Sequence, residues 1–141
     1  MKLHRMIATV LATAALSVSA FAAEDETPLG TQMEKVSKAL KAVGRAAKEG
    51  KVSKDLAAKV EEAQKATEEA LKFEPAKAKE VPAGEKEKFL ADYKASMQET
   101  IKTLDELKAA VEAEKADEVG KIMEKLNGQK KEGHKAFKKE D

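Results

Sequence analysis

His134 is the residue of this chain with the clearest capacity for chemistry. The chain contains two histidines and no cysteine. The other histidine, His4, falls within a predicted export signal. An imidazole can act as a general base or bind a metal ion. What the protein can do therefore depends on which groups stand opposite His134, close to the C-terminal end of a lysine-rich helical stretch.

Met33 is the candidate partner of His134. A neutral imidazole and a thioether together form the axial ligand pair of an electron-transfer haem. Two protein ligands fill both axial positions of the iron and leave none for oxygen or a substrate. A His134 and Met33 pair would therefore support one-electron exchange rather than catalysis, provided that the fold brings the two side chains together.

The composition predicts an all-α fold. Ala, Lys, Glu and Leu dominate, tryptophan is absent, tyrosine occurs once, and runs of β-branched residues are missing. Such a composition is typical of long helices without a sheet. Four amphipathic segments with short first and third links predict an antiparallel up-down-up-down four-helix bundle. We assign residues 23–141 to this single domain.

The first two helices are bounded by recognisable signals. Thr27 and Pro28 suit a helix start, and Gly50 suits a helix end. Ser53 is expected to cap the second helix, which ends near Phe73 because Pro75 follows. The apolar series that define the two inward faces are Leu29, Met33, Val36, Leu40, Val43 and Ala47, then Leu56, Val60, Ala63, Ala66 or Thr67, Ala70 and Leu71.

The last two helices follow a connection at residues 75–84. Asp117 is expected to cap the fourth helix. Asn127-Gly128 often marks a turn, but the apolar spacing continues across it, so we expect an unbroken helix; a break there is the alternative. The inward series are Phe89, Tyr93, Met97, Thr100 or Ile101, Leu104, Leu107 and Val111, then Val119, Ile122, Met123, Leu126, Lys130, Gly133 or His134, and Phe137.

Antiparallel packing predicts that His134 and Met33 lie at similar heights. Met33 lies about 8 Å inside the first helix at 1.5 Å per residue, and His134 lies a similar distance from the end of the fourth. Both positions are expected to face inward. The aromatic residues after residue 23 all fall near the same end: Phe73, Phe89, Tyr93 and Phe137. Large flat side chains beside an imidazole and a thioether favour a flat aromatic ligand bound from two sides.

The first 22 residues read as a secretory signal. Lys2 and Arg5 form a basic start, residues 7–20 an apolar stretch, and Ala20-Phe21-Ala22 a cleavage site. The apolar run is short for a membrane span, although an uncleaved anchor is the alternative. We therefore expect export to the periplasm, cleavage near Ala22, and no membrane attachment afterwards.

Charge and composition narrow the function classes. Without Lys2 and Arg5 the basic residues fall from 27 to 25, against 26 acidic residues. This balance does not favour nucleic-acid binding. The inward series hold no nucleophile–base pair and no carboxylate dyad, so we expect no enzyme activity. Lysines crowd the C-terminal end; they either interact with the helix C-terminus or steer an acidic redox partner.

Three stretches resemble the soluble cytochrome b562 family of exported four-helix bundles that bind one b-type haem non-covalently. They are Pro-Leu-Gly-Thr-Gln-Met33-Glu-Lys-Val, Lys-Phe89-Leu-Ala-Asp-Tyr93 and Gly-His134-Lys-Ala-Phe137. The resemblance implies Met33 and His134 as axial iron ligands, with Phe89 and Tyr93 lining the haem pocket. Lys130 stands where some members carry an arginine, and there it would meet a haem propionate as a point charge.

Together these features predict a periplasmic, monomeric b-type cytochrome that carries single electrons to and from a protein partner. One haem b is expected, bound by Met33 and His134 and contacted by Phe89, Tyr93, Lys130 and Phe137. The alternative function is a haem-free helical bundle that binds a protein or a metal in the envelope.

Overall fold

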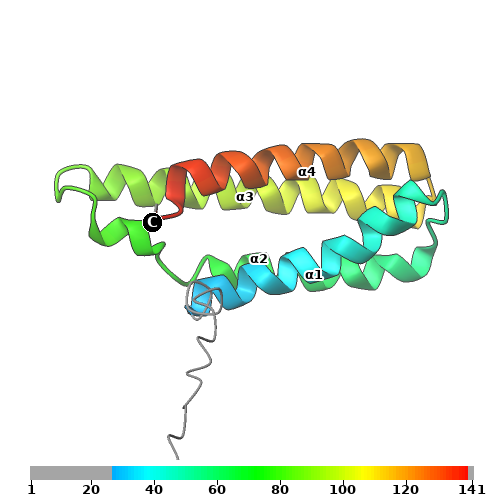
Figure 1. Ribbon diagram of the computed structural model, residues 1–141, viewed down its shortest axis with the longest axis horizontal. Helices are drawn as coiled ribbons and strands as arrows, with labels where there is room; N and C mark the ends of the chain where they lie inside the picture. Colours follow the sequence, from blue (N-terminus) through cyan, green and yellow to red (C-terminus); the bar gives the residue numbers. More distant parts are fainter. Residues whose placement is uncertain (1–26, 140–141) are drawn as a thin grey trace, which may run out of the picture.

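The protein is an up-down-up-down bundle of four α-helices (Figure 1), as predicted. The computed structural model describes residues 27–139, so the predicted signal segment lies outside it. The helices are α1 (Pro28–Lys48), α2 (Ala57–Ala70), α3 (Lys86–Glu112) and α4 (Ala116–Phe137). Two 3₁₀ turns, η2 (Lys54–Leu56) and η3 (Ala76–Lys79), precede α2 and α3 respectively.

The start of α1 follows the predicted capping. Pro28 is the first helical residue, and the Thr27 Oγ1 accepts a 2.9 Å hydrogen bond from the Gly30 N–H. That bond satisfies one of the N–H groups left without a partner in the first turn. Gly50 follows the helix with φ at +65°, a conformation that glycine adopts at little cost. Both boundary signals of α1 are therefore confirmed.

Two of the predicted caps are wrong. Ser53 makes no side-chain cap; its carbonyl instead accepts the Leu56 N–H in η2, so a 3₁₀ turn starts the second helical segment. Asp117 lies within the first turn of α4, which begins at Ala116. Glu114, with φ at +55°, forms a tight turn that lets α4 begin before Asp117. Across Asn127-Gly128 the helix is continuous, as expected.

Most of the buried core lies toward the α1–α2 and α3–α4 turns. Branched aliphatic side chains from all four helices are buried there, and six of them are 0 % exposed: Val43, Val60, Leu104, Leu107, Val111 and Val119. Side chains of this kind release roughly 1.5–3 kcal/mol each when fully removed from water. This end of the bundle, which we call the Gly44 end, therefore supplies most of the packing energy.

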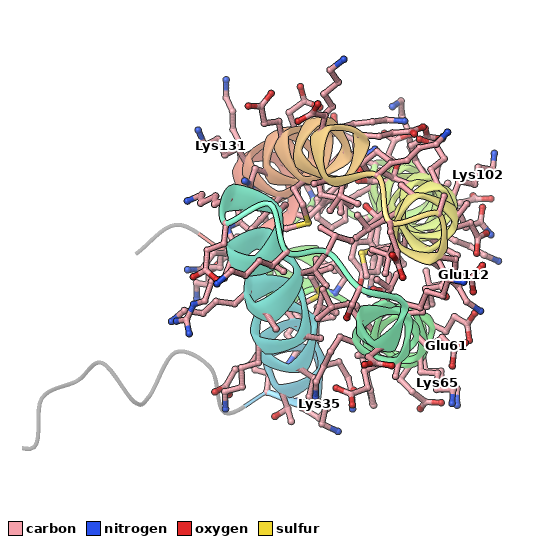
Figure 2. All side chains as sticks on the ribbon, turned by 90° about the vertical axis from the view of Figure 1, so that its right-hand side faces the viewer. Lys35, Glu61, Lys65, Lys102, Glu112 and Lys131 are labelled. Carbon is pink, nitrogen blue, oxygen red and sulfur yellow. The ribbon has the colours of Figure 1, made fainter. Side chains whose placement is uncertain are left out.

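The helices separate toward the opposite end, which holds the first turns of α1 and the last turns of α4. In Figure 1, α1 approaches α4 at the Gly44 end and diverges from it toward its own N-terminus. The view along the bundle shows the same tilt of α1 (Figure 2). We call this the Met33 end. Its buried cluster is smaller, consisting of Ala70, Tyr93 and Met97.

Charged side chains cover the outside of the bundle. The labelled charges in Figure 2, including Lys35, Lys102 and Lys131, point away from the helices. Ion pairs such as Lys38–Glu34 at 2.7 Å are well exposed, and pairs of this kind contribute at most about 1 kcal/mol each. Within residues 27–139, no helix combines the length and apolar character that a membrane crossing requires.

Candidate functional site

The Met33 end brings together residues from all four helices. Ala70 of α2 and Tyr93 and Met97 of α3 form its buried cluster. Partly buried apolar residues pack against this cluster, namely Leu29, Met33, Leu71 and Phe137. The predicted proximity of Met33 to the aromatic residues is therefore present in the fold.

Three aromatic rings stand edge to face in this region. The centroid of the Phe137 ring lies 5.5 Å from that of Phe89 and 5.5 Å from that of Tyr93, at interplanar angles of 67° and 74°. Edge-to-face pairs of this kind stabilise by about 0.5–1.5 kcal/mol beyond simple burial. The rings thus form an aromatic wall between α3 and the end of α4. Phe73, after α2, is half-buried.

Tyr93 is anchored at the bottom of this wall. Its hydroxyl donates a 3.2 Å hydrogen bond to the Ala70 carbonyl oxygen of α2. The side chain is only 7 % exposed, and burial raises its pKa from 10.0 to about 12. The phenol therefore stays neutral at ordinary pH and holds α2 and α3 together beneath the site.

The predicted inward position of Lys130 is wrong. Lys130 is exposed, whereas Gln129 is partly buried and donates from its Nε2 to the Thr103 Oγ1 of α3 at 3.0 Å. The central stripe of α4 runs through Leu126, Gly133 and Phe137, in steps of seven and four residues. At 3.6 residues per turn, Lys130 lies on one flank of that stripe and Gln129 on the other.

Gln129 is an interior residue that the apolar pattern did not identify. Its Oε1 is buried without a hydrogen-bond partner among the described residues. The Thr103 hydroxyl cannot supply that partner, because it already donates to the Glu99 carbonyl oxygen. Its position three residues after Leu126, a helical spacing, was the signal available in the sequence.

His134 is also exposed, contrary to the expectation that it faces the interior. It lies on the flank of α4 that is turned toward α1. Met123 occupies the same flank eleven residues earlier, because eleven residues turn an α-helix by about three full turns. At the Gly44 end Met123 meets α1, since a Cβ added to Gly44 would lie 3.4 Å from the Met123 Cε. The exposure of His134 follows from the divergence of α1 from α4.

The same contact sets the register between α1 and α4. Met33 lies eleven residues before Gly44, and His134 lies eleven residues after Met123. In antiparallel helices these steps run in the same direction along the bundle, about 16 Å from the Gly44–Met123 contact. Met33 also keeps the face of α1 that Gly44 occupies. This count brings Met33 and His134 to similar heights, on the flanks of α1 and α4 that face each other at the Gly44 end.

There is room beside the α4 backbone at the Met33 end. A Cβ added to Gly133 would meet no heavy atom within 4 Å, although Gly133 lies on the central stripe of the helix. A thioether, an imidazole and apolar aromatic rings at one end of the bundle are the kinds of donor and contact group that a haem requires. These residues fit such a group.

Other features of the described residues do not form a comparable site. Two shallow surface depressions lie at the Gly44 end, around the α3–α4 turn, and their walls include Glu106, Lys115, Glu118 and Lys121. Within residues 27–139, no three His, Cys, Asp or Glu side chains gather as a metal site. The Met33 end is therefore the candidate site.

Comparison with known protein families identifies one match. The family model described as Cytochrome b562 matches residues 28–138, which includes all four helices and every candidate site residue. Neither a search of curated proteins nor a search of solved structures gave a significant match.

Proposed function

The chain belongs to the cytochrome b562 family of haem-binding electron carriers, and we propose that it binds one b-type haem between α1 and α4, with Met33 and His134 as the axial ligands. The haem supplies reversible one-electron exchange at its iron. The protein supplies the two ligands, the surrounding apolar contacts and the electrostatic environment. Membership of this family favours an electron carrier over a haem-free bundle.

The observation that supports the proposal most directly is the register of α1 and α4. Counted from the Gly44–Met123 contact, Met33 and His134 would come to similar heights at the end where the two helices diverge. Both axial positions would then be filled by protein side chains, which leaves none for a substrate. Residue types and placement thus agree on electron transfer.

The other site residues have supporting roles. Phe89, Tyr93 and Phe137 would contact the porphyrin with their apolar surfaces and keep water from that side. The neutral Tyr93 hydroxyl, bonded to Ala70, keeps the wall in place. Lys130 shares the α1-facing flank with His134, four residues earlier, so its ammonium group could pair with a propionate at the solvent edge.

We further propose that the protein works in the periplasm and exchanges electrons with a protein partner. The export signal read in residues 1–22 supports the location. Lys130, Lys131, Lys135 and Lys138 are exposed around His134. Such a cluster would favour approach by an acidic partner and would do so less at high salt.

Absorption spectroscopy of the purified protein with added haem tests this function. We expect a shifted Soret band and the reduced spectrum of low-spin b-type haem. His134→Ala should weaken haem binding at least tenfold, and Met33→Ala should convert the iron to high spin because one strong-field ligand is lost. Met123→Leu, at the Gly44 end, is the matched control and should keep the parent spectrum. If haem produces no Soret shift with the parent protein, the proposal is wrong.

A further inference from the structure

Charge is divided unevenly between two opposite faces of the bundle. α1 packs against α2 and α4, and α3 packs against the same two helices. The face formed by α1 and α4 therefore lies opposite the face formed by α2 and α3 (Figure 2). α1 contains five basic residues and one acidic residue, whereas α2 contains two and four. α3 contains five and six, and α4 contains five lysines and four carboxylates, so the α1–α4 face is the basic side of the molecule.

Six exposed cations form two rows with the same spacing on the α1–α4 face. They are Lys41, Arg45 and Lys48, which we call the α1 row, and Lys131, Lys135 and Lys138, which we call the α4 row. Steps of four and three residues keep each row on one side of its helix. Lys41 and Lys48 lie three and four residues from Gly44, the α1 residue that meets Met123 of α4. In Figure 2, Lys131 projects from the side of α4 that adjoins α1.

The cations of both rows lack carboxylate partners. None of the six forms an ion pair with another residue between 27 and 139. By contrast, Lys108 of α3 pairs with Glu61 of α2 at 2.7 Å, and a further ion pair joins α4 to α3. Two carboxylates share the α1–α4 face: Glu34, which pairs with Lys38 at 2.7 Å, and Glu124, two turns before the α4 row. Most of the positive charge on this face is therefore uncompensated.

Helix ends explain only part of the two rows. A cation near a helix C-terminus is stabilised by the helix dipole, but this effect is confined to the last turn. Arg45 and Lys48 lie in the last turn of α1, and Lys135 lies in the last turn of α4. Lys41 and Lys131 lie before those turns and have no such role. The rows thus continue farther along the helices than helix stability requires.

Together the rows extend along most of the α1–α4 face. At 1.5 Å per residue, Lys48 lies about 6 Å from the Gly44–Met123 contact toward the α1–α2 turn, and Lys138 lies about 22 Å from it toward the Met33 end. This span of roughly 30 Å matches the width of a standard protein–protein interface, which buries about 800 Å² on each partner. A bounded basic patch of this size favours a folded partner over an extended polyanion.

We propose that the α1–α4 face is the docking surface for an acidic face of a partner protein. Unpaired cations on this face attract a negative surface, and the acidic α2–α3 face repels it, so approach is oriented. His134 lies within the α4 row, three residues after Lys131, so the docked partner would lie beside the proposed haem ligand. The inference names the chemistry of the partner and rests on the proposed function only for the purpose of the contact.

Binding of haem-free protein to immobilised poly-L-glutamate at low ionic strength tests this surface. The parent protein should bind, and added salt should release it because the charges are exposed. Neutralising the α1 row in the triple variant Lys41→Gln, Arg45→Gln, Lys48→Gln should weaken binding by about tenfold. These side chains are exposed, so the variant should keep its helical circular dichroism.

The matched control is the triple variant Lys65→Gln, Lys94→Gln, Lys102→Gln. It removes three exposed cations without ion pairs from α2 and α3 and has the same net charge as the α1-row variant. Its binding should change by less than about twofold, because the α2–α3 face points away from the acidic surface.

Three outcomes would overturn the proposal: no binding of the parent protein to poly-L-glutamate, equal losses in the two triple variants, or a loss in the α1-row variant that appears only with phosphatidylglycerol vesicles. The second outcome would show that net charge alone governs binding, and the third that the face recognises a lipid surface. None of these measurements uses haem, so a failure of haem binding and a failure of docking are separate results.

Discussion

The two ends of this bundle are made from the same four helices but are packed differently. At the Gly44 end, α1 lies close enough to α4 for Gly44 to meet the Met123 side chain, and branched residues such as Leu107 are 0 % exposed. At the Met33 end, α1 leans away from α4, and Met33 and Phe137 are only partly buried. The Gly44 end therefore holds the fold together.

The candidate site lies at the end of the bundle where less apolar surface is buried. Large aromatic side chains, a histidine and two methionines occupy the end that contributes least to packing, while Val, Leu and Ala fill the other. Room between helices lowers stability because buried apolar contacts are lost. A group that packs against the aromatic wall would restore such contacts. Binding to the native state alone would then raise stability with ligand concentration.

Leucine truncations at the two ends should differ most. Leu107→Ala removes a fully buried side chain at the Gly44 end and should lower the free energy of unfolding by about 2–5 kcal/mol. Leu29→Ala makes the same chemical change where the side chain is partly exposed, and its cost should be less than half as large. Urea unfolding of the haem-free protein measures both. Equal losses would show that the ends are equally packed.

Alkaline titration of Tyr93 tests whether solvent reaches its hydroxyl in the buried cluster of the Met33 end. Burial raises the pKa of Tyr93 from 10.0 to about 12, so folding favours the neutral phenol. That contribution is complete below pH 10 and is lost as the pH rises from 10 through 12. The total loss should be on the order of 2 kcal/mol.

Because the chain has one tyrosine, the ultraviolet absorbance of tyrosinate reports this group alone. The folded protein should titrate with a midpoint near 12. Tyr93→Phe should remove the stability change that this group causes between pH 10 and 12. A midpoint near 10 in protein that is still helical would mean that water reaches the Tyr93 hydroxyl and that the buried cluster of the Met33 end is hydrated.

Glycine substitutions in α4 should produce the smallest change in stability, and they compare a position at the site with one away from it. Gly133→Ala should stabilise the haem-free protein by about 0.5–1 kcal/mol, since alanine is the better helix former and its Cβ would meet no heavy atom within 4 Å. Gly128→Ala, on the exposed face of the same helix, should stabilise similarly. Thermal unfolding measures both.

Haem titrations of the same two variants then separate the positions. A methyl group at residue 133 would enter the open space beside the central stripe of α4. Gly133→Ala should therefore weaken haem binding, whereas Gly128→Ala should leave it unchanged. Equal haem affinities would show that Gly133 does not border the site.

The helical fold and the order of its elements follow from the sequence alone. Apolar residues spaced by three and four positions specify one buried face for each helix. Thr27, Pro28 and Gly50 mark the start and the end of α1 through their local geometry. The same spacing correctly predicted that α4 continues through Asn127-Gly128. Local chemistry was less decisive at Ser53 and Asp117, where a 3₁₀ turn and a tight turn at Glu114 replaced the expected caps.

The exposure of the site residues depends on how the helices pack against one another. Counting residues along each helix placed Met33 and His134 at similar heights, but it could not show that Lys130 and His134 lie on a flank and Gln129 on the opposite one. That choice depends on the rotation of α4 against its neighbours, which Gly44–Met123 and Gln129–Thr103 contacts set. The tilt of α1 likewise arises from packing between helices, because no pattern within one helix encodes the distance to another.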